Sequence, residues 1–189
     1  MPHFPASDSL PTAPKPSRVS IPSSSELHPA VIHPSHVTIP RLESGPRLDD
    51  FLTGTARSQA AKQMLRISDF IDRYPKDGRP VTEPTVAYLG YTREYFFAAF
   101  VCKDKTPRLI RAHMLARDSL GDDDFVEVML DTFDDQRRAF MFDSNALGIQ
   151  GDGLYSEQNA ADKSYDTVWY TWAKRTPFGY EVLMRIPYA

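Results

Sequence analysis

The chain has 189 residues, enough for one domain with residues to spare, and its hydrophobic fraction of 41% can supply a core. A net charge of -3 and the lack of any basic cluster exclude nucleic acid and anionic membrane as expected partners, since both select a concentrated basic patch. No stretch of the sequence is apolar over the length needed to span a bilayer. The single cysteine, Cys102, excludes an internal disulfide.

The first 38 residues differ in composition from the rest of the chain. They are rich in Pro, Ser and His, and their frequent prolines prevent a helix or a sheet ladder from propagating. We therefore expect residues 1–38 to form a disordered tail or linker, followed by one domain over residues 39–189. The start lacks the basic and apolar segments of a signal peptide. Either a signal has been removed from an exported protein or the protein is cytoplasmic.

Regular structure is expected from residue 37 onward. Residues 37–40 are a candidate first strand. Residues 56–65 predict one short helix, because they lack Pro, Gly and β-branched residues. Segments 85–91 and 95–102 predict strands of a hairpin, since only three residues separate them. Segment 109–115 fits a strand or a helical turn equally well.

The second half of the chain continues with short strands. Segment 125–131 alternates, with Val126, Val128 and Leu130 on one face. Segment 139–143 is a further strand, and segments 167–174 and 180–186 form a last hairpin. The side chains of that hairpin expected to face the core are Tyr180, Val182, Met184 and Ile186. Many short strands at this spacing predict an all-β fold, an antiparallel β-sandwich.

A series of short motifs resembles a known family. The motifs are DGRP at 77–80, TEPTV at 82–86, RD at 117–118, DDDFVEVMLDTF at 122–133, NALGIQGDG at 145–153, YDTVW at 165–169 and GYEVLMRIPY at 179–188. Their order and spacing resemble carbohydrate-binding module family 9 of the DOMON-like superfamily, which implies that the sandwich is jelly-roll-like. More narrowly, they resemble the domain that precedes an outer-membrane β-barrel in bacterial surface proteins.

The resemblance implies a function and a location. It implies a non-catalytic module that binds the end of an oligosaccharide or polysaccharide, in carbohydrate catabolism or cell-surface glycan recognition. Calcium would support the fold, and the protein would be extracellular, periplasmic or associated with the outer membrane, with a barrel domain as a possible partner. Family domains continue past the motif at 179–188, so we expect the sandwich to be truncated at its C-terminus. The alternative is a structural domain that packs on a surface barrel without sugar affinity.

Candidate ligand groups lie in the polar segments 117–124 and 143–153. A sugar site needs planar hydrogen-bonding groups for hydroxyls and a flat ring for the apolar face of the sugar. The candidates are Arg117, Asp118, Asp143, Asn145, Gln150 and Trp169, with Trp172 as another possible ring. Arg117 and Asp118 could equally brace a loop, and both tryptophans could be packing residues.

Carboxylates also suggest a metal site. Calcium prefers oxygen ligands, and the candidate donors are Asp104, Asp122, Asp123 and Asp124. Their spacing does not match an EF-hand, and three consecutive acids could also be a solvated turn. A haem site of DOMON type, with Met129, Met141 or His113 as a ligand, is a third possibility.

Catalytic patterns are missing from the sequence. Glu127 and Asp131 share a strand face but would lie about 13 Å apart, too far for a glycosidase pair. Cys102 sits in an apolar run, and no glycine-rich phosphate loop precedes a helix. The sequence therefore predicts a binding module and no enzyme.

Overall fold

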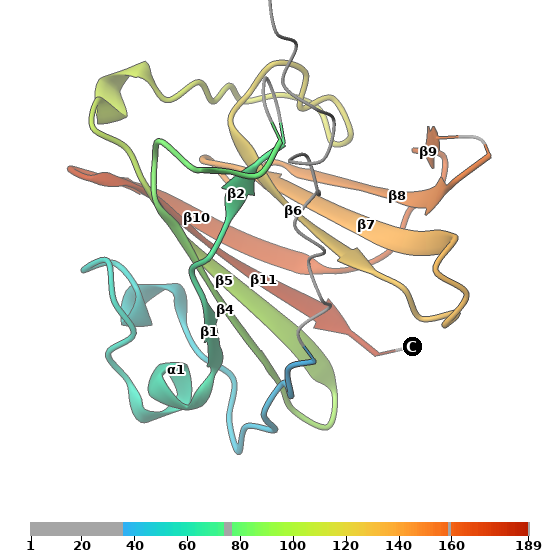
Figure 1. Cartoon of the computed structure of the whole chain (residues 1–189), viewed down its shortest axis with the longest axis horizontal. Coiled ribbons are helices and arrows are strands. Elements are labelled where there is room, and N and C mark those ends of the chain that lie inside the picture. The colour runs from blue at the N-terminus through green and yellow to red at the C-terminus, as the bar shows by residue number, and fades with distance from the viewer. Residues whose placement is uncertain (1–35, 74–76, 159, 189) are drawn as a thin grey trace, which may run out of the picture. The chain divides into compact units, whose positions relative to one another are not determined.

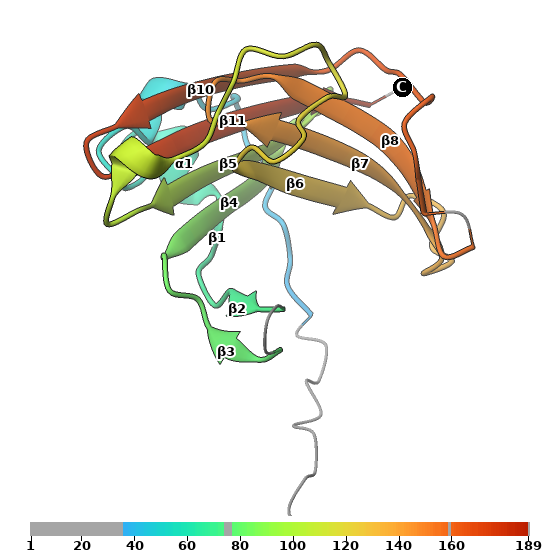
Figure 2. The same cartoon turned by 90° about the horizontal axis from the view of Figure 1, so that it is seen from above.

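Two antiparallel sheets pack face to face in the unit that spans Val37–Ala189. This computed structural model describes residues 36–73, 77–158 and 160–188, so the predicted tail over residues 1–38 lies almost wholly outside the described residues. The larger sheet has the strand order β1 (Leu65–Ile67), β4 (Thr85–Tyr91), β5 (Tyr95–Lys103), β11 (Gly179–Pro187) and β10 (Tyr170–Thr176). The smaller sheet has the order β6 (Phe125–Leu130), β7 (Arg138–Asn145), β8 (Gln150–Ser156) and β9 (Ala160–Asp162). The predicted all-β sandwich is confirmed, and its layers are visible in Figure 2.

The larger sheet is the middle layer of three. On one side its strands meet the smaller sheet, where Phe142 and Trp169 lie in a common core with β5 and β11. On the other side the segment before β1 covers β4 and β5, with the 3-10 helix η1 (Leu48–Asp50), the short helix α1 (Gln59–Gln63) and the fully buried Phe51. Figure 1 shows α1 and this segment on one side of the larger sheet and β6 to β8 on the other.

The middle position explains the sequences of the strands. Because β5 and β11 are buried on both faces, they are nearly continuous apolar runs. Strand β6 alternates instead, since its outer face is open to solvent. The core-facing residues predicted for the last hairpin and for 125–131 are confirmed: Tyr180, Val182, Met184 and Ile186 from β11, and Val126 and Val128 from β6.

Three local expectations differ from the structure. Residues 37–40 form no strand, and the chain makes only an isolated parallel bridge from Arg41 to Tyr91. Segment 109–115 is irregular after the 3-10 helix η2 (Pro107–Leu109). The polar segment 143–153, for which no strand was predicted beyond residue 143, is mostly strand: it holds the end of β7, a short turn and the start of β8.

Two short strands lie outside the two main sheets. Strands β2 (Ile71–Asp72) and β3 (Arg79–Pro80) form a separate two-stranded ribbon that projects from the sandwich in Figure 2. Among the described residues, no helix has the length and apolar character that crossing a membrane requires.

Candidate functional site

Arg117 and its neighbours form an internal clasp. The Arg117 guanidinium donates to the Asp152 carboxylate at 2.9 Å and to the Thr167 carbonyl oxygen at 2.6 Å. Asp118, in the left-handed region at φ 65°, accepts the backbone N–H of Asp152 at 2.9 Å. Gln150 accepts from Arg117 at 3.4 Å and donates to the Trp169 carbonyl oxygen at 2.9 Å. Arg117 therefore pairs with Asp152 and not with Asp118, and the group joins the loop before β6 to β8 and to the approach to β10.

Asn145 belongs to a second internal network. Its amide nitrogen donates to the Asp123 carboxylate at 2.9 Å and to the His113 carbonyl oxygen at 3.1 Å. Its amide oxygen accepts the N–H groups of Leu147 and Ile149, both at 2.9 Å. All four hydrogen-bonding positions of the amide are thus filled, and the residue is fully buried. Asn145 has no group left for a sugar hydroxyl.

Asp123 is held in its charged form by the same network. Burial by itself would raise the pKa of its carboxyl, but the backbone N–H and ring of His113 and the amide of Asn145 outweigh that effect and lower the pKa. The Asp123 carboxylate accepts hydrogen bonds from both residues, so its oxygens are already engaged.

Asp143 lies on the outer face of the smaller sheet, opposite Glu127 on β6. Burial and then the neighbouring Glu127 charge raise the pKa of Asp143 to about 7. Its Oδ1 atom has no hydrogen-bond partner in the described part of the chain. The Asp143 carboxyl therefore keeps its proton up to near neutral pH.

The two tryptophans lie in different environments: Trp169 precedes β10, and Trp172 lies within it. Trp169 is 3% exposed and meets Phe142 edge-on in the inter-sheet core, with ring centroids 5.4 Å apart. A ring in this position presents no free face to a ligand. Trp172 is 42% exposed on the opposite face of the larger sheet.

The residues proposed for calcium do not meet in one place. Asp124 accepts the N–H of Arg111 at 2.7 Å, and Asp104 accepts the N–H of Thr106. In the described ranges, no three His, Cys, Asp or Glu side chains lie close enough to hold a metal ion. This donor set does not fit a single ion, and calcium binding stays a prediction that nothing in the structure tests.

The methionines suggested as haem ligands lie on an open face. Met129 and Met141 are cross-strand partners on the outer side of the smaller sheet, and Met129 is 44% exposed. The ring of His113 is engaged with Asp123. Nothing in this arrangement brings the three residues together as a haem pocket would.

A different group of side chains gathers on the outer face of the larger sheet. We call Tyr95, Tyr170, Trp172 and Arg185 the aromatic–arginine platform. Residues 170 and 172 share a face of β10, and the register places Tyr170 directly opposite Arg185 on β11. The Tyr170 and Trp172 rings are inclined by only 15°, with centroids 6.3 Å apart, and Tyr170 is 40% exposed.

Arg185 is fixed among the three rings. Its guanidinium carbon lies 4.3 Å from the Tyr170 ring centroid, 4.8 Å from that of Tyr95 and 5.2 Å from that of Trp172. These distances are within the range of cation–π attraction. Its Nε is buried and has no hydrogen-bond partner among the described residues. The platform therefore presents flat apolar rings around a donor group that is held in place and unpartnered at Nε.

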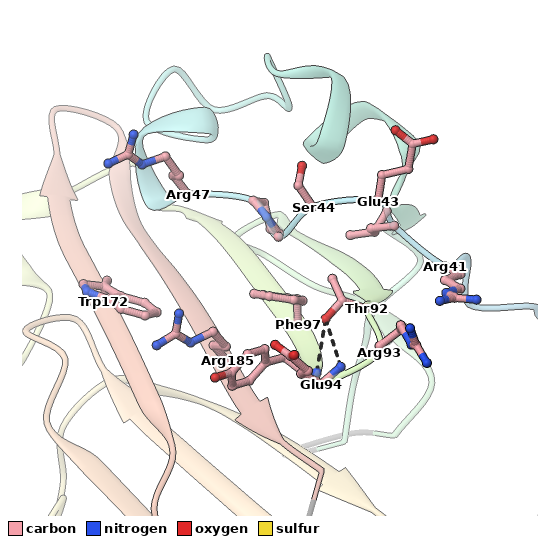
Figure 3. Close-up of a pocket in the computed structure, with 14 residues that line it drawn as sticks. Arg41, Glu43, Ser44, Arg47, Thr92, Arg93, Glu94, Phe97, Trp172 and Arg185 are labelled. Carbon is pink, nitrogen blue, oxygen red and sulfur yellow. Dashed lines mark hydrogen bonds between the residues drawn. The ribbon is translucent and has the colours of Figure 1, made fainter.

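Three residues of the platform, Tyr95, Trp172 and Arg185, form one wall of a cavity of about 720 Å³, and Tyr170 does not line it. Residues 41–47 form the opposite wall, and the β4–β5 turn, ordered by Thr92, closes one end (Figure 3). Gly45 makes the close approach of this wall possible, because a Cβ there would lie 2.4 Å from the Phe97 ring. An adjoining hollow of about 400 Å³ shares Arg47, Trp172 and Arg185. The cavity volume lies in the range of about 300–1,000 Å³ that is usual for small-molecule sites.

The candidate residues chosen from the sequence lie elsewhere in the fold. Of the rings it offered, only Trp172 belongs to the platform, and none of the predicted polar groups does. Two features of the sequence could have indicated the platform. Aromatic residues at 170 and 172 fall on one strand face, and Arg185 interrupts an apolar strand. The Arg117 clasp contacts the smaller sheet, whereas the platform lies on the face of the larger sheet that points away from it.

Comparison with known proteins supports the fold. No protein-family model and no curated protein matches the chain. A candidate carbohydrate-binding protein from Bacteroides uniformis superposes with a TM-score of 0.57 at 14% identity, over 80% of this chain and 72% of that protein. A family 9 carbohydrate-binding module from Caldicellulosiruptor kristjanssonii in complex with cellotriose gives a TM-score of 0.47 at 16% identity, over 80% and 67%. At 14% identity, the first likeness shows that the two chains share a fold and no more.

Proposed function

We propose that the chain is a non-catalytic carbohydrate-binding module and that the aromatic–arginine platform is its sugar site. The observation that carries the proposal is the exposed ring of Trp172 at the wall of the cavity, with the nearly parallel, exposed ring of Tyr170 on the same strand face, 6.3 Å away between centroids. A pyranose has an apolar C–H face that covers an aromatic ring and hydroxyl groups at its edge that need fixed polar partners. Arg185 and Arg47 supply such partners beside Trp172 (Figure 3).

The fold agrees with this use of the platform. The Bacteroides uniformis protein that shares it is described as carbohydrate-binding. A sheet face is a rigid support, so the rings are oriented before the sugar arrives and little conformational entropy is lost on binding. The proposed function depends on no residue of the Arg117 clasp.

The test is calorimetric titration of the chain with neutral mono- and oligosaccharides, among them cello- and xylo-oligosaccharides. We expect one sugar class to bind saturably, and Trp172→Ala to weaken its affinity at least tenfold. The variant should fold, since the Trp172 ring is nearly half exposed. Tyr170→Ala should also weaken binding, whereas Tyr155→Ala removes an equally exposed ring from β8 and should leave affinity unchanged.

Two results would contradict the proposal. Sugar binding that survives both Trp172→Ala and Tyr170→Ala would place the site elsewhere. A cooperatively folded chain that binds no sugar would favour the structural alternative, a domain that packs on a surface barrel. Export, a role in carbohydrate catabolism and an attached barrel domain stay predictions of the family resemblance.

A further inference from the structure

Arginines dominate the charged lining of the cavity. Four arginines line it against two glutamates, although the chain as a whole has a net charge of -3. The arginines are Arg41, Arg47, Arg93 and Arg185, and the glutamates are Glu43 and Glu94. Figure 3 shows Glu43 at the end of the cavity that lies away from Trp172, and Arg47 and Arg185 at the Trp172 end. Arg41 and Arg93 lie with Glu43 at the other end in the same view, so positive charge is spread along the cavity, and Arg185 is the arginine that contacts the sugar-stacking ring.

Arg185 also lacks an anionic partner of its own. Among the described residues it forms no ion pair with a carboxylate, although Glu94 lines the same cavity. Its buried Nε is an unsatisfied donor, and three aromatic rings surround its guanidinium. A buried donor of this kind favours a ligand that brings an acceptor, and a charged acceptor binds about twice as strongly as a neutral one.

We infer that the platform binds an acidic sugar, with the carboxylate of a uronic acid on Arg185 and the sugar ring against Trp172. This inference rests on the proposed function and names the ligand class of the same site. A guanidinium matches the planar geometry of a carboxylate, and stacking among the rings fixes the orientation of its donors. Arg47, at the rim of the same end, adds positive charge beside the carboxylate.

The decisive probes are trisaccharides of galacturonic acid and of glucuronic acid, each titrated beside its methyl ester. The ester keeps the shape of the sugar and removes its charge. We expect at least one acid to bind tenfold or more tightly than its ester at low salt. The dissociation constant of the acid should rise several-fold in 500 mM NaCl, because salt screens the charge attraction, and that of the ester should change little.

Variants of Arg185 then locate the effect. Arg185→Met should abolish the preference for the acid over the ester. Arg108→Met removes an exposed arginine of η2 that does not line the cavity, and should keep the preference. If Arg185→Met does not fold, Arg185→Lys is the test, because lysine keeps the charge but lacks the planar guanidinium. The affinity of this variant for the acid should be at least fivefold lower than that of the wild type.

The outcomes separate this inference from the proposed function. Equal affinity for acid and ester, with binding lost in Trp172→Ala, would overturn the acidic ligand and leave sugar binding intact. Absence of binding by every sugar, acidic or neutral, would overturn both. Tighter binding of a sulfated trisaccharide than of either uronate would overturn the carboxylate assignment. An acid preference unchanged in the Arg185 variants would overturn the role of that residue.

Discussion

Replacing Arg117 with Met is expected to lower stability strongly while leaving ligand binding intact. The Asp152 side chain is fully buried, and in Arg117→Met its carboxylate would keep, among the described residues, only the hydrogen bond from the backbone N–H of Thr167, at 2.8 Å. Removing one partner of a buried ion pair costs about 3–5 kcal/mol, because the other charge is left uncompensated. That is a large share of a typical domain stability of about 5–15 kcal/mol. For a domain of this size it corresponds to a fall in Tm of roughly 6–20 °C.

The assay is urea unfolding followed by far-UV circular dichroism. Asp166→Asn is the matched control, because Asp166 also contacts the Arg117 guanidinium, at 3.0 Å, but its side chain is 72% exposed. An exposed ion pair is worth about 0–1 kcal/mol, so this control should unfold almost as the wild type does. Adding Asp152→Asn to Arg117→Met should recover part of the loss, because the second change removes the stranded charge.

Two results would refute this reasoning. A loss below about 1 kcal/mol in Arg117→Met would mean that the clasp does not brace the fold. If Arg117→Met has normal stability but no longer binds sugar, the sugar site lies at the residues that the sequence favoured and not at the platform. The expected outcome, a less stable protein whose folded fraction binds normally, separates the clasp from the platform.

Two further predictions concern a carboxyl group and a glycine. The folded-state pKa of Asp143 is raised to about 7 by burial and by Glu127, so its contribution is lost as pH rises through that value. As the pH rises from 5 to 8, the free energy of unfolding of Asp143→Asn should therefore increase relative to that of the wild type, by at most about 3 kcal/mol. If the two free energies, measured by urea unfolding, change with pH in the same way, this prediction is wrong. Gly179→Ala should prevent folding, because a Cβ would lie 1.8 Å from the Cys102 carbonyl oxygen at φ 149°. Gly78→Ala, at φ 79° with open space around the new Cβ, should lower stability by only about 1–2 kcal/mol. If Gly78→Ala and Gly179→Ala lose the same stability, the clash with the Cys102 carbonyl oxygen is not the cause.

The strands that the sequence located well share one property. Strand β4 occupies the predicted residues 85–91, and β5, β6 and β11 differ from their predictions by a residue or two at their ends. These strands are apolar or alternate regularly, so the burial of each side chain follows from its own position in the chain. The predicted helix over 56–65 is shorter in the structure, because its last residue, Leu65, pairs with β4 as the start of β1.

Strand β8 was missed because its sequence is polar and rich in glycine. Asp152 lies in the middle of this strand, 2% exposed, and its burial is possible only because Arg117 reaches it from 35 residues away. A pairing over that separation leaves no local pattern in the sequence. Because of the same pairing, the Arg117 side chain, which was a candidate for ligand binding, is engaged inside the fold.

The sequence by itself determined that this chain forms an antiparallel sandwich and which faces of its apolar strands are buried, because hydrophobic periodicity is a local property of the chain. The tertiary structure decided which polar groups are consumed inside the fold and which remain available to a ligand. Arg117 and Asn145 became internal partners, whereas Arg185 was left among three rings with an unpartnered Nε. The physical reason is that a hydrogen-bond donor is free only when every possible partner in the folded chain is accounted for, and those partners come from distant strands.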